Sequence, residues 1–143
     1  MCDHKDAERY TDGAVATVNA RDWDGYGAFF AEDVAMRFPG AIDGSVSGRA
    51  ARVGFVKGIM RAFPDGRISR VRVFGMGDWG CCQFAFEGTN TGPLAGSDGT
   101  DTPATGRRAA FPYCVVARWE GGEIVEFDEY FDRLEMLAQL GLA

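Results

Sequence analysis

The chain has 143 residues, 46% of them hydrophobic and 25% charged, a composition that excludes a disordered segment and fits one globular domain over residues 1–143. Fifteen basic against twenty-one acidic residues give a formal net charge of -6, which argues against a nucleic-acid partner because no cluster of lysine and arginine offsets it. No apolar run approaches the roughly 18 residues that span a bilayer, and residues 1–6 lack the organisation of a signal peptide, so we expect a cytoplasmic protein with no membrane partner.

Two helices are predicted at the start of the chain. Tyr10, Ala14 and Val18 recur at helical spacing within residues 5–21, and a second, short helix is expected over residues 22–30. Each helix presents one apolar face, so we expect both to pack against a core.

A short strand and a longer helix follow. The pattern of residues 34–38 predicts a strand that ends at Pro39-Gly40, and Ser47 is expected to cap a helix over residues 48–63. The apolar face of this helix is expected to carry Val53, Val56, Met60 and Phe63.

The second half of the chain changes to a strand pattern. Glycine-rich turns at residues 77–80 and 120–122 separate strand segments, residues 92–106 form a longer loop, and residues 133–140 return to helical spacing. Helices followed by an antiparallel meander predict an α+β fold in which the helices cover one face of the sheet. The four predicted strands are residues 68–75, 81–89, 107–119 and 123–132.

One charged residue in the last predicted strand lies on its apolar face. Side chains alternate across a strand, so Phe127, Glu129 and Phe131 share the face that is expected to be buried. A buried carboxylate without a partner is costly, so Glu129 is either paired with an arginine such as Arg118 or retained for chemistry, unless the register slips by one residue. If it is retained for chemistry, Glu129 is a candidate catalytic acid/base.

The cysteines and the histidine do not indicate a metal site. The four cysteines, at positions 2, 81, 82 and 114, have no CxxC spacing, and the adjacent Cys81 and Cys82 point to opposite faces of a strand. His4 is the one histidine of the chain and lies close to its start. We therefore expect neither a bound metal nor catalysis by histidine.

Five short motifs occur in order between residues 86 and 141. They are Phe86-Glu87-Gly88-Thr89-Asn90-Thr91-Gly92-Pro93-Leu94, Pro103-Ala104-Thr105-Gly106-Arg107-Arg108, Val116-Ala117-Arg118, Gly122-Glu123-Ile124-Val125-Glu126 and Leu137-Ala138-Gln139-Leu140-Gly141. In these motifs and their spacing the chain resembles the SnoaL-like polyketide cyclase family of the nuclear-transport-factor-2-like superfamily. The first half of the chain resembles that family only in the order of its helices and strand.

The resemblance implies both a shape and a chemistry. The fold would be a cone, in which N-terminal helices and a strongly curved sheet enclose a pocket. The reaction would be the intramolecular aldol ring closure of an aromatic polyketide ester, with an aspartate as acid/base and no metal or organic cofactor. That aspartate corresponds to Glu129, which is one methylene longer. The histidines of some relatives correspond to Val115 and Asn90, so the matching positions hold no histidine here.

Other polar residues are candidates for the same site. Tyr113 shares strand parity with Val115, so it is expected on the side of Glu129 unless Pro112 interrupts the strand. Asn90 is a second candidate for stabilising a developing oxyanion, and it fits a turn equally well. Further polar candidates are Gln83 and Asn19.

Aromatic and apolar residues are expected to bind the substrate. They suit a planar, hydrophobic ligand, and they would equally suit an ordinary core. The candidates are Trp23, Tyr26, Phe38, Met60, Phe63, Val115, Phe127 and Phe131.

Three classes of function stay open on the sequence. The first is a cofactor-independent cyclase or isomerase of a polyketide-like or other hydrophobic carbonyl compound, with Glu129 as acid/base. The second is an epoxide-opening hydrolase or pyran-forming cyclase, in which Glu129 and Tyr113 position a water or a hydroxyl. The third is a non-catalytic domain for binding small molecules or for dimerisation. A lid at residues 92–106 would favour an enzyme, and a homodimer would use the convex sheet face with Cys114 and Val116.

Overall fold

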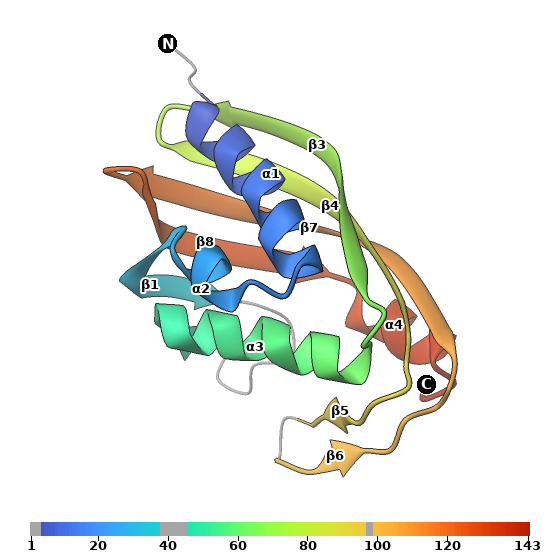
Figure 1. Cartoon of the computed structure of the whole chain (residues 1–143). Helices are drawn as coiled ribbons and strands as arrows, with labels where there is room; N and C mark the ends of the chain where they lie inside the picture. The colour runs from blue at the N-terminus through green and yellow to red at the C-terminus, as the bar shows by residue number, and fades with distance from the viewer. Residues whose placement is uncertain (1–3, 38–45, 97–98) are drawn as a thin grey trace.

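The computed structural model describes residues 4–37, 46–96 and 99–143 (Figure 1). The candidate Phe38 and the predicted strand end at residues 39–40 lie outside the described residues. None of the described helices is long and apolar enough to cross a membrane. In chain order the elements are α1 (Lys5–Asn19), α2 (Trp23–Gly27), β1 (Phe30–Arg37), β2 (Val46–Ser47), α3 (Arg49–Ala62), β3 (Arg67–Met76), β4 (Trp79–Thr89), β5 (Leu94–Ala95), β6 (Asp101–Thr102), β7 (Arg108–Glu120), β8 (Glu123–Phe131) and α4 (Arg133–Gln139).

Six strands form one curved sheet, in the order β2-β1-β8-β7-β4-β3 (Figure 1). Neighbouring strands are antiparallel except β1 and β8, which run parallel. The hairpins β3-β4 and β7-β8 turn at Gly77-Asp78 and at Gly121-Gly122, where all three glycines have a positive φ. The four predicted strands and the α+β class are thereby confirmed.

Two details around the first strand differ from the prediction. The helix α2 ends at Gly27, and Phe30 begins β1 instead of ending a helix, because it pairs with Ile124 of β8 in the sheet. Ser47 does not cap α3, since it pairs with β1 in the sheet. The residue before α3 is Gly48, whose φ of 102° lies in the left-handed region that favours glycine.

The helices pack on one face of the sheet. α1 lies against β3 and β4, while α3 lies against β1 (Figure 1). Between α1 and the sheet, the ring of Tyr10 meets the rings of Phe30 and Phe127 edge-on, with centroids 5.8 Å apart in both pairs. These contacts fix α1 over the concave face of the sheet.

The predicted loop at residues 92–106 contains a small hairpin, because β5 and β6 pair with each other. It is attached to the end of α3: the Gly92 N–H donates to the Ala62 carbonyl at 3.1 Å, and Arg61 forms an ion pair with Asp101 at 2.9 Å. A Cβ at Gly92 would lie 2.0 Å from the backbone oxygen of Arg61, so the close approach requires glycine. The hairpin therefore lies beside α3.

Candidate active site

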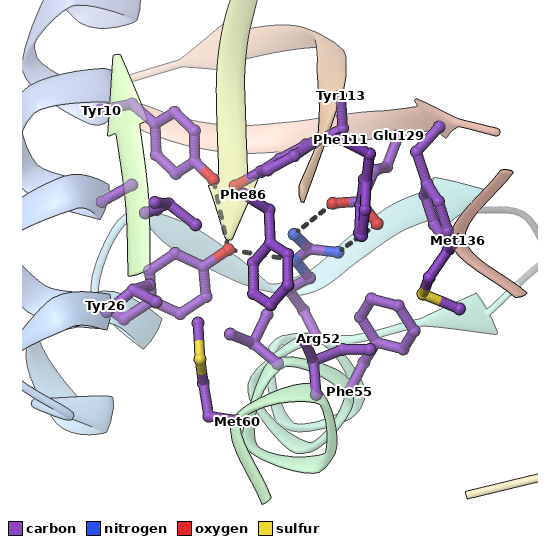
Figure 2. Close-up of a pocket in the computed structure, with 16 residues that line it drawn as sticks. Tyr10, Tyr26, Arg52, Phe55, Met60, Phe86, Phe111, Tyr113, Glu129 and Met136 are labelled. Atoms are coloured by element: carbon purple, nitrogen blue, oxygen red, sulfur yellow. Dashed lines mark hydrogen bonds and ion pairs between the residues drawn. The ribbon is translucent and has the colours of Figure 1, made fainter. Parts of the chain in front are cut away.

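A pocket lies between the helices and the concave face of the sheet (Figure 2). Among the described residues, its walls come from α1, α2, α3 and α4 and from β3, β4, β7 and β8, and most of the lining side chains are apolar. The polar groups are those of three tyrosines, one arginine and one glutamate. The lining residues are Tyr10, Ala14, Val18, Tyr26, Arg52, Phe55, Val56, Ile59, Met60, Ile68, Phe86, Phe111, Tyr113, Glu129, Phe131 and Met136.

Glu129 lies in the wall of this pocket, on the buried face of β8 that strand alternation predicts. Its side chain is 6% exposed, and that of Arg52 is 4% exposed. Oε1 of Glu129 accepts a hydrogen bond from Nη2 of Arg52 at 2.9 Å, and Oε2 accepts one from Nη1 at 3.2 Å (Figure 2). The bidentate pair supplies the opposite charge that a buried carboxylate requires.

Arg52 is the main site residue that the sequence analysis missed. It lies on α3 four residues before Val56 and eight before Met60, so helical spacing places it on the apolar face of the helix. Its guanidinium carbon lies 4.7 Å from the ring centroid of Phe127. Burial by itself lowers the pKa of Arg52, but the charge of Glu129, its hydrogen bond to Arg52 and the neighbouring Tyr26 and Tyr10 together outweigh burial, and the pKa is raised well above its ordinary value. A charged residue on the apolar face of a predicted helix was the sequence signal that could have identified Arg52 as a site residue.

The suggested pairing of Glu129 with Arg118 is wrong. Arg118 is opposite Glu126 in the pairing of β7 with β8, and its Nε donates to Glu126 at 2.7 Å while its Nη1 donates to Glu120 at 2.7 Å. These groups lie on the outer face of the sheet. The alternative of a one-residue slip is wrong as well, because Asp128 also lies on that outer face and Glu129 faces the pocket.

Tyr113 lies in the pocket wall, as its parity with Val115 predicts. The pairing of β4 with β7 has no shift at Pro112, so the strand continues without interruption. The Tyr113 ring stacks on Phe84 with centroids 5.1 Å apart. Burial raises the pKa of Tyr113 well above its ordinary value, and the nearby charge of Glu129 raises it further. Tyr113 is therefore a neutral hydrogen-bond donor at physiological pH.

Two further tyrosines connect to the ion pair. Nε of Arg52 donates to the hydroxyl of Tyr26 at 3.1 Å, and the hydroxyls of Tyr26 and Tyr10 lie 3.2 Å apart (Figure 2). Both tyrosines are almost completely buried. Burial and the neighbouring Tyr26 raise the pKa of Tyr10 well above its ordinary value. A chain of hydrogen-bonded groups therefore runs from Glu129 through Arg52 and Tyr26 to Tyr10.

Five of the predicted substrate-binding residues lie in the pocket or directly behind it. Val115 is opposite Glu129 in the sheet and fully buried, so it forms the layer behind the lining. Phe127 lies under the guanidinium of Arg52 in the same layer. Those that line the pocket are Tyr26, Met60 and Phe131.

The remaining candidates lie elsewhere. Phe63 is buried against Phe86, with ring centroids 5.1 Å apart, and Trp23 lines a surface groove beside α2 and α3. Asn19 exchanges hydrogen bonds of 2.9 Å with the backbone of β3. Gln83 faces away from the pocket, because its neighbour Phe84 stacks on Tyr113 at the inner face.

Asn90 has a structural environment. It is fully buried, and its Nδ2 donates to the carbonyls of Ala62 and Gly92 at 3.1 and 2.9 Å. Its Oδ1 accepts from the N–H and the hydroxyl of Thr105 at 2.8 and 3.0 Å. Asn90 does not line the pocket, and its amide is fully bonded, so we leave it out of the proposed catalytic set.

The segment at residues 92–106 does not form a lid over the pocket, because none of its described residues lines it. Phe55 on α3 and Met136 on α4 also line the pocket, and the sequence analysis did not predict them. Their spacing in the sequence is that of ordinary core residues, so it does not mark them as pocket residues.

In the part of the chain that the structure describes, no three His, Cys, Asp or Glu side chains are grouped to hold a metal ion.

The curved sheet, the covering helices and the enclosed pocket define the nuclear-transport-factor-2-like fold. A family model for the SnoaL-like polyketide cyclases matches residues 8–140, and the chain belongs to that family. A search of curated proteins found no match. Solved structures confirm the fold. They include TsrD from Streptomyces laurentii, with 18% identity, a TM-score of 0.82 and coverage of 99% of this chain and 98% of that one.

Two further solved structures match to a similar extent. IdmH from Streptomyces antibioticus has 24% identity and a TM-score of 0.79, and the match covers 96% of this chain and 99% of that one. AclR from Streptomyces galilaeus has 24% identity and a TM-score of 0.79, and the match covers 96% of this chain and 87% of that one. At these identities the likeness concerns the fold alone.

Proposed function

We propose that this protein is a cyclase or isomerase of a hydrophobic carbonyl compound, with Glu129 as its acid/base. The observation that carries the proposal is the carboxylate of Glu129, held by Arg52 in the wall of an otherwise apolar, aromatic-rich pocket. Membership of the SnoaL-like polyketide cyclase family supports a small molecule as the substrate. A neutral, planar polyketide would suit walls that include Phe86, Phe111 and Phe131.

The proposed reaction moves one proton. Glu129 accepts a proton from the carbon beside a carbonyl, and the electron pair shifts to the carbonyl oxygen. Tyr113 donates a hydrogen bond to that oxygen as its charge develops. The carbon of the resulting enolate attacks a second carbonyl of the same molecule, which closes the ring. The new alkoxide then takes the proton back from Glu129, so no net proton is gained or lost.

Each neighbour of Glu129 has a defined part in this scheme. Arg52 fixes the orientation of the carboxylate through two hydrogen bonds, so the base does not have to be reoriented during the reaction. The aromatic walls keep water from the enolate and hold the substrate in a folded conformation. The proposal therefore assigns acid/base chemistry to one residue and positioning to its surroundings.

A second candidate is the opening of an epoxide or the closure of a pyran ring. The pairing of a carboxylate with an arginine beside a phenol favours it, because Glu129 can accept a proton from a water or hydroxyl while Tyr113 donates to the epoxide oxygen. The same residues would act: the oxygen of the water or hydroxyl attacks an epoxide carbon, the C–O bond of the epoxide breaks, and the resulting alkoxide takes the proton from Glu129.

Solvent deuterium exchange tests the leading candidate without knowledge of the natural substrate. The benzo-fused cyclic ketone 2-tetralone is incubated with the protein in D2O, and NMR follows exchange at the benzylic carbon beside the carbonyl. The wild type should accelerate exchange, and Glu129→Gln should lower the acceleration at least about 100-fold while still binding the ketone. Equal exchange by both proteins would refute a role for Glu129.

A parallel assay with styrene oxide separates the other candidates. Hydrolysis of styrene oxide without ketone exchange would establish the second candidate. Binding of both compounds without either reaction would define the protein as a ligand-binding domain.

We also propose that a second copy of the chain covers the outer face of the sheet. Val116 and Cys114 lie on this face, and large exposed side chains on β3, β4 and β8 lie on the same face. Sedimentation equilibrium should give the mass of a dimer, and Phe74→Asp should give that of a monomer. A monomeric wild type would refute this proposal. The large exposed side chains are Phe74, Met76, Trp79 and Tyr130.

A further inference from the structure

Three phenolic hydroxyls point to the same part of the pocket. Figure 2 shows the hydroxyls of Tyr10, Tyr26 and Tyr113 turned toward one another, on the side of Arg52 that faces away from Glu129. Tyr10 is carried by α1, Tyr26 by α2 and Tyr113 by β7, so three separate elements bring them together. Apart from these tyrosines, Arg52 and Glu129, the residues that line the pocket are apolar.

The charge of Arg52 favours one direction for the hydrogen bonds in this group. A guanidinium has no acceptor, so Nε of Arg52 donates to the hydroxyl oxygen of Tyr26. That oxygen is polarised by a cationic donor, which strengthens the hydroxyl of Tyr26 as a donor in turn. Either hydroxyl could be the donor across the 3.2 Å between Tyr26 and Tyr10, and we infer that Tyr26 donates because its hydroxyl is the one that Arg52 polarises. The chain runs from Arg52 through Tyr26 to Tyr10.

Two hydroxyl protons in this group of tyrosines are then unused, one at the end of the chain on Tyr10 and one on Tyr113, which is not part of the chain. The hydroxyl proton of Tyr10 has no acceptor among the described residues once Tyr26 donates to it. The hydroxyl of Tyr113 likewise has no hydrogen-bond partner in residues 4–37, 46–96 and 99–143. Both tyrosines line the pocket, so both protons are available to a ligand.

We propose that Tyr10 and Tyr113 form a subsite that binds one ligand oxygen, either a carbonyl oxygen that gains negative charge or a phenolate. The proposal rests on the proposed function, since it uses the same pocket, and it adds a second donor and a ligand class. Because the charge of Arg52 is matched by Glu129, the subsite recognises its oxygen through neutral phenols. The ligand is then a planar molecule whose oxygen carries partial or full negative charge, such as an enolate or a phenolate.

The packing holds both donors in place before a ligand arrives. The Tyr10 ring has the rings of Phe29 and Phe30 edge-on at 5.6 and 5.8 Å, and the Tyr113 ring stacks on Phe84. Burial raises the pKa of both tyrosines, so both keep their protons at neutral pH. Donors that are fixed and protonated in advance need no rearrangement when charge develops on the ligand.

Binding of 4-nitrophenolate tests the subsite without any turnover. The visible absorbance of 4-nitrophenol is titrated with protein at about pH 8, where its phenolate predominates. Tyr113→Phe and Tyr10→Phe should each weaken binding about ten-fold or more, because each removes one hydrogen bond to a charged oxygen. Tyr130→Phe is the matched control: this tyrosine is 55% exposed on the outer face, and its loss should leave Kd unchanged. Tyr26→Phe should weaken binding by a smaller factor, since it removes only the polarisation of Tyr10.

The results have distinct meanings. Unchanged Kd values for Tyr113→Phe and Tyr10→Phe, or no binding by the wild type, would overturn the subsite. If Tyr10→Phe does not fold, as judged by circular dichroism, the comparison of Tyr113→Phe with Tyr130→Phe still decides the matter. A wild type that binds the phenolate through its tyrosines but exchanges no ketone proton would refute the proposed function and leave the subsite intact.

Discussion

Replacing Arg52 with methionine is expected to destabilise the fold by about 3–5 kcal/mol, which is typical of a buried ion pair that loses one partner. The substitution removes two hydrogen bonds to Glu129 and one to Tyr26. It leaves a carboxylate that is 6% exposed without its counter-charge. Methionine matches arginine only as far as Nε, so the variant also loses the contact of the guanidinium with Phe127. A double variant that also replaces Glu129 carries the same truncation and separates the effect of the charge.

Urea denaturation measures this effect through the midpoint of unfolding at constant m value. The double variant with Arg52→Met and Glu129→Met should recover most of the lost stability, because no single charge stays buried. Arg108→Met is the control: its ion pair with Glu87 joins two strands at the surface, where the loss should be at most about 1 kcal/mol.

Two results would refute the reasoning. An Arg52→Met loss no larger than that of Arg108→Met would mean that the pair is solvated. A double variant less stable than Arg52→Met would mean that Glu129 does not require its partner. Either result would remove the argument that the pocket contains a desolvated, oriented carboxylate.

Three further perturbations test other parts of the structure. Asn90→Ala should lower the free energy of unfolding, measured by urea denaturation, by at least about 2 kcal/mol, because it leaves buried backbone groups unpaired. The folded fraction should keep its activity in ketone deuterium exchange. A variant that is stable but has lost this activity would contradict the structural role of Asn90. Gly92→Ala should destabilise the fold by about 1–3 kcal/mol, because the new Cβ would clash with the backbone of Arg61. Gly58→Ala should stabilise it by about 0.5–1 kcal/mol, because the new Cβ would lie in open space within α3. Equal effects of the two substitutions on the urea midpoint would contradict both predictions. Because the pKa of Tyr113 is raised in the fold, the unfolded chain loses that proton first, so stability should fall as the pH rises above about 10. Tyr113→Phe should show a shallower fall between urea midpoints at about pH 8 and pH 10.5, and an identical fall would exclude this linkage.

The local sequence pattern predicts that Glu129 lies on the buried face of its strand, but it does not predict which residue pairs with it. Strand alternation has a period of two, so one charged residue between Phe127 and Phe131 is enough to mark the buried face. The same logic, applied with a period of 3.6, would have identified Arg52 on the face of α3 that carries Val56 and Met60. What no local pattern gives is that these two residues meet, because the contact depends on how α3 packs against the sheet.

Other residues show the same limit. The sequence does not decide whether Asn90 is a turn residue or a hydrogen-bond donor to an oxyanion, because an asparagine suits both roles. The hydrogen bonds to Thr105 and Ala62 in the structure show that its amide is fully bonded. The parallel pairing of β1 with β8 was equally out of reach, since it joins strands separated by most of the chain. Short-range elements were thus predictable, and contacts between distant elements were not.

The ion pair joins residues that are 77 positions apart, and this separation has a consequence for the order of folding. A compact intermediate that has docked α3 but not β8 would bury Arg52 without a counter-charge, and one that has docked β8 alone would bury Glu129 in the same way. Both partial structures are disfavoured, so the helix and the strand should enter the core in one concerted step. A growing chain on the ribosome that has not yet made β8 would keep Arg52 in water, and the pocket would be complete only after the last strand is synthesised.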